Sequence, residues 1–138
     1  MSTVEHDVQQ IVARYGLTLD SRDHDALGAL HAEEAQWSFS LGGQVVIGPF
    51  TGRNAILDFA IGAASEAPPE RHILTNVVVT VESESTSNAI AYLTLVHIAG
   101  TTPVISATAV ARFLFTAVGG CWLITNLHIE FDSAPIRR

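Results

Sequence analysis

Residues 71–82 read RHILTNVVVTVE, and three stretches of the same kind follow: SNAIAYLTLVHIA (87–99), VISATAVARFLFTAV (104–118) and CWLITNLHIEF (121–131). Runs this rich in β-branched and aromatic residues are typical of strands. Short segments with Ser, Thr, Gly and Pro separate them. Since consecutive strands joined by short turns run antiparallel, the second half of the chain is predicted to form an antiparallel meander.

Helical spacing dominates the part of the chain that precedes these strands. Apolar side chains recur three and four positions apart over residues 4–19, which predicts one amphipathic helix. A polar break at 20–23 leads into a short second helix that ends near Ala32. A third helix over about 52–66 is stopped by Ala67-Pro68-Pro69.

A hairpin is predicted between the second and third helices. Ala35–Leu41 reads as a strand, Gly42-Gly43 as a two-residue turn and Gln44–Ile47 as the returning strand. Because the predicted helices gather in the first half of the chain and the long strands in the second half, the chain is assigned to the α+β class. We expect a cone-shaped, curved antiparallel or mixed sheet of about six strands, wrapped around three N-terminal helices with an apolar pocket. Nothing divides residues 1–138 into more than one domain.

Composition narrows the function classes. The net charge of −7 disfavours nucleic acid and anionic membranes as partners. The single cysteine, Cys121, allows no internal disulfide and no cysteine-based metal site. The histidines lack the spacing of metal ligands, so neither a metal nor a cofactor is expected. The N-terminus lacks a signal-peptide pattern and no apolar run is long enough to span a membrane, which predicts a cytoplasmic location.

Three stretches carry a resemblance to a known family: YGLTLDSRD (15–23), GPFTGRNAI (48–56) and RHILTNV (71–77). On these, the chain from about residue 4 to residue 132 resembles the nuclear-transport-factor-2-like superfamily. Within it, the chain is similar to the SnoaL-like group, which includes scytalone dehydratase and hexachlorocyclohexane dehydrochlorinase. The resemblance implies the cone fold. It narrows function less, because the superfamily contains dehydratases, isomerases, cyclases, epoxide hydrolases and non-catalytic modules.

The resemblance also implies a pair of catalytic residues. In the dehydratase and dehydrochlorinase members, an aspartate ending the first helix pairs with a histidine opening the first long strand. Asp20 and His72 stand at these positions. The carboxylate would fix the tautomer of the imidazole and leave its other nitrogen as a general base or acid. Without the resemblance, the same residues also fit a helix cap and a half-buried strand histidine.

The match to the family's other site residues is incomplete. Tyr15 and Leu127 stand where the dehydrochlorinase has basic side chains that assist the leaving group. The substrate-binding asparagine and serine of scytalone dehydratase have no clear match in residues 108–111. The pair is therefore expected to be retained while the substrate and the reaction differ.

Six further residues are predicted to contact a substrate: Tyr15, Trp37, Phe39, Asn76, His97 and His128. Strand alternation puts Asn76 on the face of His72. Each also has a structural interpretation. The aromatic residues also fit the core, the histidines also fit solvent-facing or interface positions, and Asn76 also fits a structural role in its strand. Arg112 and Glu130 are expected to pair across neighbouring strands.

Two functions follow from this reading. The first is a cofactor-independent enzyme of the lyase, isomerase or polyketide-cyclase type, acting on a small, mostly apolar ring compound. The second is a non-catalytic module that binds a small ligand or serves as an accessory subunit, as the small subunit of ring-hydroxylating dioxygenases does. A homodimer is expected in either case, because both faces of the sheet look apolar.

Overall fold

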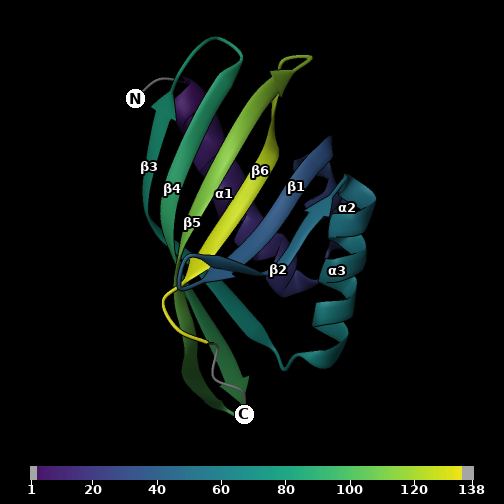
Figure 1. Cartoon of the computed structure of the whole chain (residues 1–138), viewed down its shortest axis with the longest axis vertical. Coiled ribbons are helices and arrows are strands. Elements are labelled where there is room, and N and C mark those ends of the chain that lie inside the picture. Colours follow the sequence, from purple (N-terminus) through teal and green to yellow (C-terminus); the bar gives the residue numbers. More distant parts are fainter. Residues whose placement is uncertain (1–2, 135–138) are drawn as a thin grey trace.

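The described part of the chain, residues 3–134 of this computed structural model, forms three helices and one six-stranded sheet (Figure 1). In chain order the elements are α1 (Thr3–Ser21), α2 (His24–Ala29), β1 (His31–Leu41), β2 (Gln44–Thr51), α3 (Arg53–Glu66), β3 (Glu70–Val81), β4 (Thr86–Ala99), β5 (Thr102–Val118) and β6 (Cys121–Phe131).

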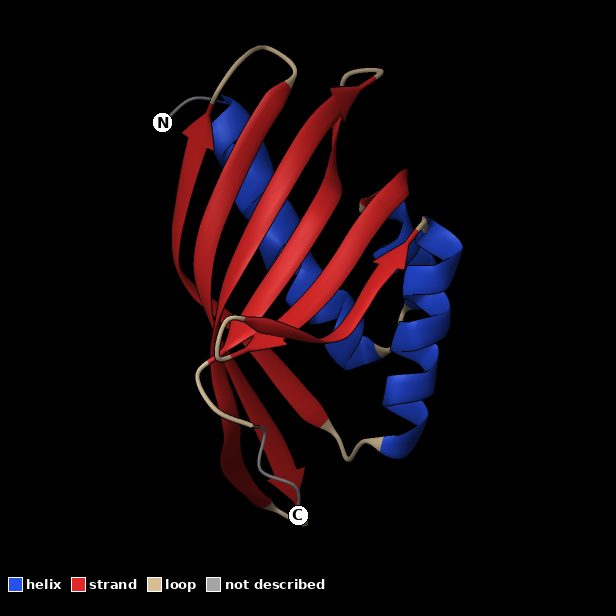
Figure 2. Ribbon diagram, viewed as in Figure 1, coloured by secondary structure: helices blue, strands red, loops and turns tan. Residues whose placement is uncertain are grey.

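The strands lie in the order β2-β1-β6-β5-β4-β3. Strands β3 to β6 form the predicted antiparallel meander, and the hairpin of β1 and β2 joins it through a parallel pairing of β1 with β6. The sheet is therefore mixed and open, with β2 and β3 at its edges. Figure 2 shows it twisted and curved, with α1 running behind the strands and α3 beside β2. The α+β prediction is confirmed.

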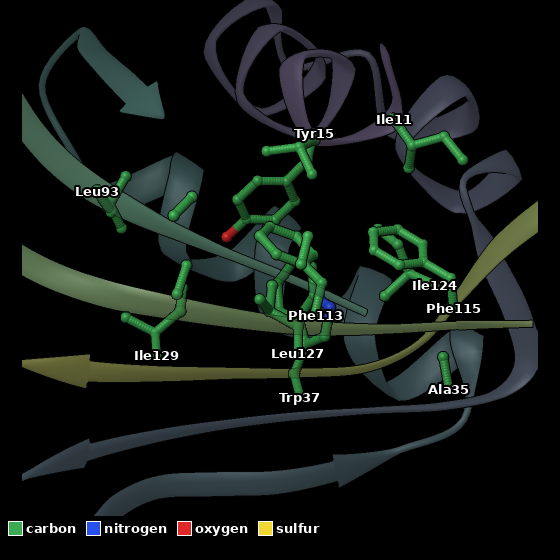
Figure 3. Packing of buried hydrophobic residues seen from close by; sticks show 14 of the residues in the cluster. Ile11, Tyr15, Ala35, Trp37, Leu93, Phe113, Phe115, Ile124, Leu127 and Ile129 are labelled. Atoms are coloured by element: carbon green, nitrogen blue, oxygen red, sulfur yellow. The ribbon is translucent and has the colours of Figure 1, made fainter. Parts of the chain in front are cut away.

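The core lies between α1 and the concave face of the sheet (Figure 3). The predicted stripe of α1 supplies Val8, Val12 and Tyr15, all buried. Phe113 and Leu127 meet it from β5 and β6 and are also fully buried. Burial of such side chains stabilises the fold by about 1.5–3 kcal/mol each, so the middle of α1 is held against the sheet by packing.

The turn from α1 to α2 and a close approach of α1 to β3 position the end of the first helix. Asp23 caps α2, because its Oδ1 accepts a hydrogen bond of 3.1 Å from the Ala26 backbone N–H. At Gly16 a Cβ atom would lie 2.7 Å from the carbonyl oxygen of His72. Because residue 16 is a glycine, α1 can approach the first residues of β3 closely. This approach brings Asp20 beside His72.

Several predicted boundaries are wrong. Helix α2 ends at Ala29 and β1 already begins at His31, although the sequence predicted a strand from Ala35. Strand β2 continues through Gly48 and Pro49 to Thr51. An edge strand tolerates proline, since half of its backbone groups have no partner strand.

A bulge in β3 reverses the predicted alternation of its side chains. The register shifts between Thr75 and Val78, and Asn76 takes a left-handed backbone conformation with φ of 56°. Asparagine adopts this conformation more readily than most residues. Beyond the bulge Val77 packs on the core, while Asn76 and Val78 are exposed. The prediction that Asn76 shares the face of His72 is therefore wrong.

The outer face of the sheet carries no helix within residues 3–134. Ile73, Tyr92, Ile105 and Leu114 are exposed there, with Ile105 at 60%. None of the described helices has the length and apolar character needed to cross a membrane.

Candidate functional site

An apolar cavity of about 410 Å³ lies where α1 and α3 face the strands of the sheet. The rings of Trp37, Phe39 and Phe59 form one wall and pack against one another. Leu93 and Ile129 contribute from β4 and β6. The structure thus places Trp37 and Phe39 on the cavity, where the sequence predicted a pocket wall or core. Most of the lining is hydrocarbon, which suits a small apolar ligand.

Asp20 and His72 meet at the edge of this cavity. Asp20 Oδ1 lies 2.7 Å from His72 Nδ1, and both carboxylate oxygens accept hydrogen bonds of 3.0 and 3.1 Å from the His72 backbone N–H. The side chains are 11% and 18% exposed, respectively. The contact that the resemblance implied is therefore present, and α1 and β3 are fixed together at this point.

The bonding pattern determines the tautomer of His72. A carboxylate only accepts hydrogen bonds, so the neutral imidazole must carry its proton on Nδ1 to bind Asp20. Nε2 then has a free lone pair, on a side chain that lines the cavity. A histidine held in this way is suited to take a proton from a ligand and to return it.

Tyr15 places a hydroxyl group in the same cavity. Its ring makes edge contacts with Trp37 and Phe113. Figure 3 shows the hydroxyl pointing toward the side on which Leu93 and Ile129 lie, and both of these line the cavity. Burial, and secondarily the negative charge of Asp20, raises the pKa of Tyr15 well above its ordinary value. The hydroxyl therefore remains protonated and can donate a hydrogen bond.

Glu70 is a cavity residue that the sequence reasoning missed. It lines the cavity and pairs with His97, whose Nε2 lies 2.7 Å from Glu70 Oε2. The two residues stand directly opposite each other on β3 and β4. Strand alternation could have identified Glu70, which lies two residues before His72 on the same face. His97, predicted to contact substrate, is buried behind Glu70 and does not itself line the cavity.

Two predicted substrate contacts lie elsewhere. His128 is on the outer face, where its Nδ1 lies 2.7 Å from Ser38 Oγ and its Nε2 lies 2.8 Å from Ser40 Oγ. It alternates with Ile129, which faces the cavity, so the prediction for His128 is wrong. Asn76 is exposed at the bulge and is also outside the cavity.

The expected pair of Arg112 and Glu130 is not found among the described residues. Arg112 stands opposite His128, and Glu130 stands opposite Val110. Glu130 instead accepts hydrogen bonds from Ser40 Oγ and, at 3.3 Å, from the Gly43 backbone N–H, which lower the pKa of its carboxyl. Residues 3–134 contain no cluster of three or more metal-ligating side chains.

A second missed residue, His31, anchors the aromatic wall. Its Nε2 accepts a hydrogen bond of 2.9 Å from Trp37 Nε1, and its Nδ1 lies 2.8 Å from the Leu27 carbonyl oxygen. Burial lowers the pKa of His31 to about 4, although the hydrogen bond to Leu27 opposes this change. His31 is therefore neutral at pH 7 and fixes the indole of Trp37 at the cavity.

Comparison with known proteins gives one family match. The family model of the SnoaL-like domain matches residues 2–128. No curated protein sequence matches the chain.

Solved structures from Novosphingobium aromaticivorans share the fold. An NTF2-like protein with a cystatin-like fold is 24% identical, with a TM-score of 0.79 over 92% of this chain and 80% of that chain. A protein provisionally described as a scytalone dehydratase is 17% identical, with a TM-score of 0.76 over 97% and 93%. The beta subunit of a protein provisionally described as an aromatic-ring-hydroxylating dioxygenase is 15% identical, with a TM-score of 0.81 over 97% and 92%. At these identities the likeness concerns the fold.

Proposed function

The chain belongs to the SnoaL-like family, and we propose that it is an enzyme in which His72 and Asp20 act as a general acid/base pair on a small, mostly apolar ring compound. One observation carries this proposal. A histidine that lines an apolar cavity is hydrogen-bonded at 2.7 Å to a carboxylate that leaves its second nitrogen free.

The proposed reaction moves one proton. The aromatic wall holds the ring of the substrate and excludes water. His72 Nε2 takes a proton from a carbon or hydroxyl group, and Asp20 stabilises the imidazolium that forms. The imidazolium then returns the proton to a leaving oxygen, to another carbon or to the oxygen formed in ring closure. These three outcomes are dehydration, double-bond isomerisation and aldol-type cyclisation, and none of them needs a metal or cofactor.

Tyr15 is proposed to bind a substrate oxygen. Its hydroxyl faces the cavity from the same helix that supplies Asp20. A hydrogen bond donated there would stabilise negative charge that develops on the substrate when His72 removes a proton. Trp37 and Phe39 are proposed to contact the apolar part of the substrate.

The base can be tested with 5-nitrobenzisoxazole, a small neutral bicyclic compound whose ring opens when a base removes its C–H proton. We expect the wild-type protein to accelerate this opening over buffer. His72→Ala and Asp20→Asn should each lower kcat/KM by roughly 100-fold or more. His6→Ala removes an exposed histidine of α1 and serves as the matched control, with an unchanged rate. An unchanged rate in His72→Ala or Asp20→Asn, with the fold intact by circular dichroism, refutes the proposal.

The exposed outer face favours a second candidate, a non-catalytic subunit. Tyr92 and Ile105 are 54% and 60% exposed there, and apolar surface of this kind is typical of interfaces. For the enzyme we propose a homodimer. Light scattering on the purified chain separates the candidates. A soluble homodimer supports the enzyme, whereas an insoluble chain that a co-expressed partner rescues supports the subunit.

A further inference from the structure

Two histidine–carboxylate pairs meet the cavity through residues two positions apart on β3. In one pair the histidine lines the cavity, and in the other the carboxylate does. At His72 the imidazole lines the cavity and the carboxylate of Asp20 lies behind it. At Glu70 the carboxylate lines the cavity and the imidazole of His97 lies behind it. Residues two apart on a strand are separated by about 7 Å. A single ring compound can therefore contact both inward groups.

The surroundings of His97 bear on how it pairs with Glu70. His97 is 9% exposed, and its Nδ1 is buried with no hydrogen-bond partner among residues 3–134. In a protonated ring this atom would be a charged N–H donor without an acceptor, which is costly in a buried position. In the neutral ring only a lone pair is unsatisfied. A ring with its single proton on Nε2 avoids this cost, and in that form His97 donates to Glu70 Oε2 and adds no positive charge beside the carboxylate.

A second negative charge acts on the same space. The carboxylate of Asp20 lies 2.7 Å from His72 Nδ1, directly behind the imidazole that lines the cavity. None of the described residues that line the cavity is a lysine or an arginine. The negative charge of Asp20 also contributes to the raised pKa of Tyr15, whose hydroxyl faces the cavity. Charges surrounded by apolar walls act more strongly on a ligand than they do in water.

We propose that the cavity selects its ligand by charge, and that Glu70 is the specificity-determining residue. Its carboxylate accepts a hydrogen bond from a hydroxyl or ammonium group on the ring compound, about one ring away from the atom that His72 deprotonates. Compounds that carry a carboxylate or phosphate are repelled. This inference deepens the proposed function, because it names the class of ligand for the same cavity, but it concerns binding and not turnover.

Three probes with one ring system test it: 2-tetralol, 2-aminotetralin and tetralin-2-carboxylate, titrated into the full chain by calorimetry at pH 7. We expect the hydroxyl and ammonium probes to bind at least about tenfold more tightly than the carboxylate. The relative affinities of the hydroxyl and ammonium probes show which donor Glu70 prefers. Equal affinity for all three probes, tighter binding of the carboxylate, or binding of none of them overturns the proposal.

Glu70→Gln separates specificity from structure, since the carboxamide can still accept the hydrogen bond from His97. This variant should weaken binding of the ammonium probe by about tenfold and tighten binding of the carboxylate. Glu84→Gln removes an exposed carboxylate from the turn between β3 and β4 and should change neither affinity. An equal change for all three probes in Glu70→Gln would indicate a purely structural role and overturn the proposal. The preference should persist in His72→Ala, so a failure of catalysis is a separate result.

Discussion

Tyr15 belongs to two environments, with its ring in the core and its hydroxyl at the cavity. The ring is fixed by edge contacts with Trp37 and Phe113 at centroid distances of 5.9 and 5.5 Å. The hydroxyl is directed toward the space that a ligand would occupy. A residue of this kind contributes to stability through its ring and to function through its oxygen.

We therefore expect Tyr15→Phe to separate these contributions. The free energy of unfolding should change by less than about 0.5 kcal/mol, because the ring contacts are kept. The rate of opening of 5-nitrobenzisoxazole should fall by roughly threefold to tenfold, the usual effect of losing one neutral hydrogen bond to the leaving oxygen. Denaturant titration and steady-state kinetics check both values. A large loss of stability with an unchanged rate would assign Tyr15 to the core alone.

The sequence predicted the positions of some site residues correctly and missed or misplaced others. The sequence placed Asp20 at a helix end and His72 at a strand start, but only the family resemblance joined two residues so far apart in the chain. Glu70 was missed because a lone carboxylate at a strand start looks solvated. His128 was misplaced because nothing in an apolar strand tells which face meets the helices.

At the scale of elements, the contact of α1 with β3 holds the site together. Gly16 lies one turn before Asp20, and its Cα faces the backbone of His72. The helix and the strand thus approach more closely than any larger residue would allow. The position of the Asp20 carboxylate depends on this approach.

Gly16→Ala should therefore damage the site and the fold together. The added Cβ would lie 2.7 Å from a backbone oxygen, so α1 must move away from β3. We expect a loss of roughly 1–3 kcal/mol in the free energy of unfolding and at least tenfold in the rate with 5-nitrobenzisoxazole. Gly62→Ala is the matched control in α3, where a Cβ meets no atom within 4 Å. Equal effects of the two alanine substitutions on stability and rate would contradict this role of Gly16.

The elements themselves were largely predictable, and their irregularities were not. The β-branched runs and the glycine pair identified every strand and the hairpin turn. The bulge at Asn76 escaped prediction, because one residue with positive φ changes the faces of all the residues after it without altering the composition of the strand. The early start of β1 at His31 also escaped, since its backbone pairs with β6, almost a hundred residues later in the chain.

At the scale of the whole molecule, long-range pairing could be inferred only through the resemblance. Local patterns favoured a meander and a separate hairpin, whereas the parallel contact of β1 with β6 unites them in one curved sheet. Curvature leaves room for the cavity on the inner face. The mixed sheet is thus the feature that brings Trp37 of β1 and His72 of β3 to the same cavity.

The fold as a whole should be sensitive to acid through His31. Its pKa is about 4 in the folded chain against an ordinary value of 6.5, so between these values the unfolded chain binds more protons. The contribution of His31 to the free energy of unfolding should be constant above pH 6.5. It should fall as the pH drops toward 4, by at most roughly 3 kcal/mol. Denaturant titrations from pH 4 to pH 7 measure this loss of stability.

His31→Gln isolates this contribution. A glutamine does not titrate, so the difference in unfolding free energy between wild type and variant should shrink as the pH falls. His6→Gln, at an exposed position of α1, should follow the wild type. Parallel curves for the wild type and His31→Gln would contradict the role of His31.

The most direct test of the account is the position of the proton on the neutral imidazole of His72. Long-range ¹H–¹⁵N correlation spectra of the labelled protein report it. We predict a protonated Nδ1 and a free Nε2 in the wild type, with this preference lost in Asp20→Asn. A wild-type spectrum with the proton on Nε2 would show that no base faces the cavity, and would contradict the central claim.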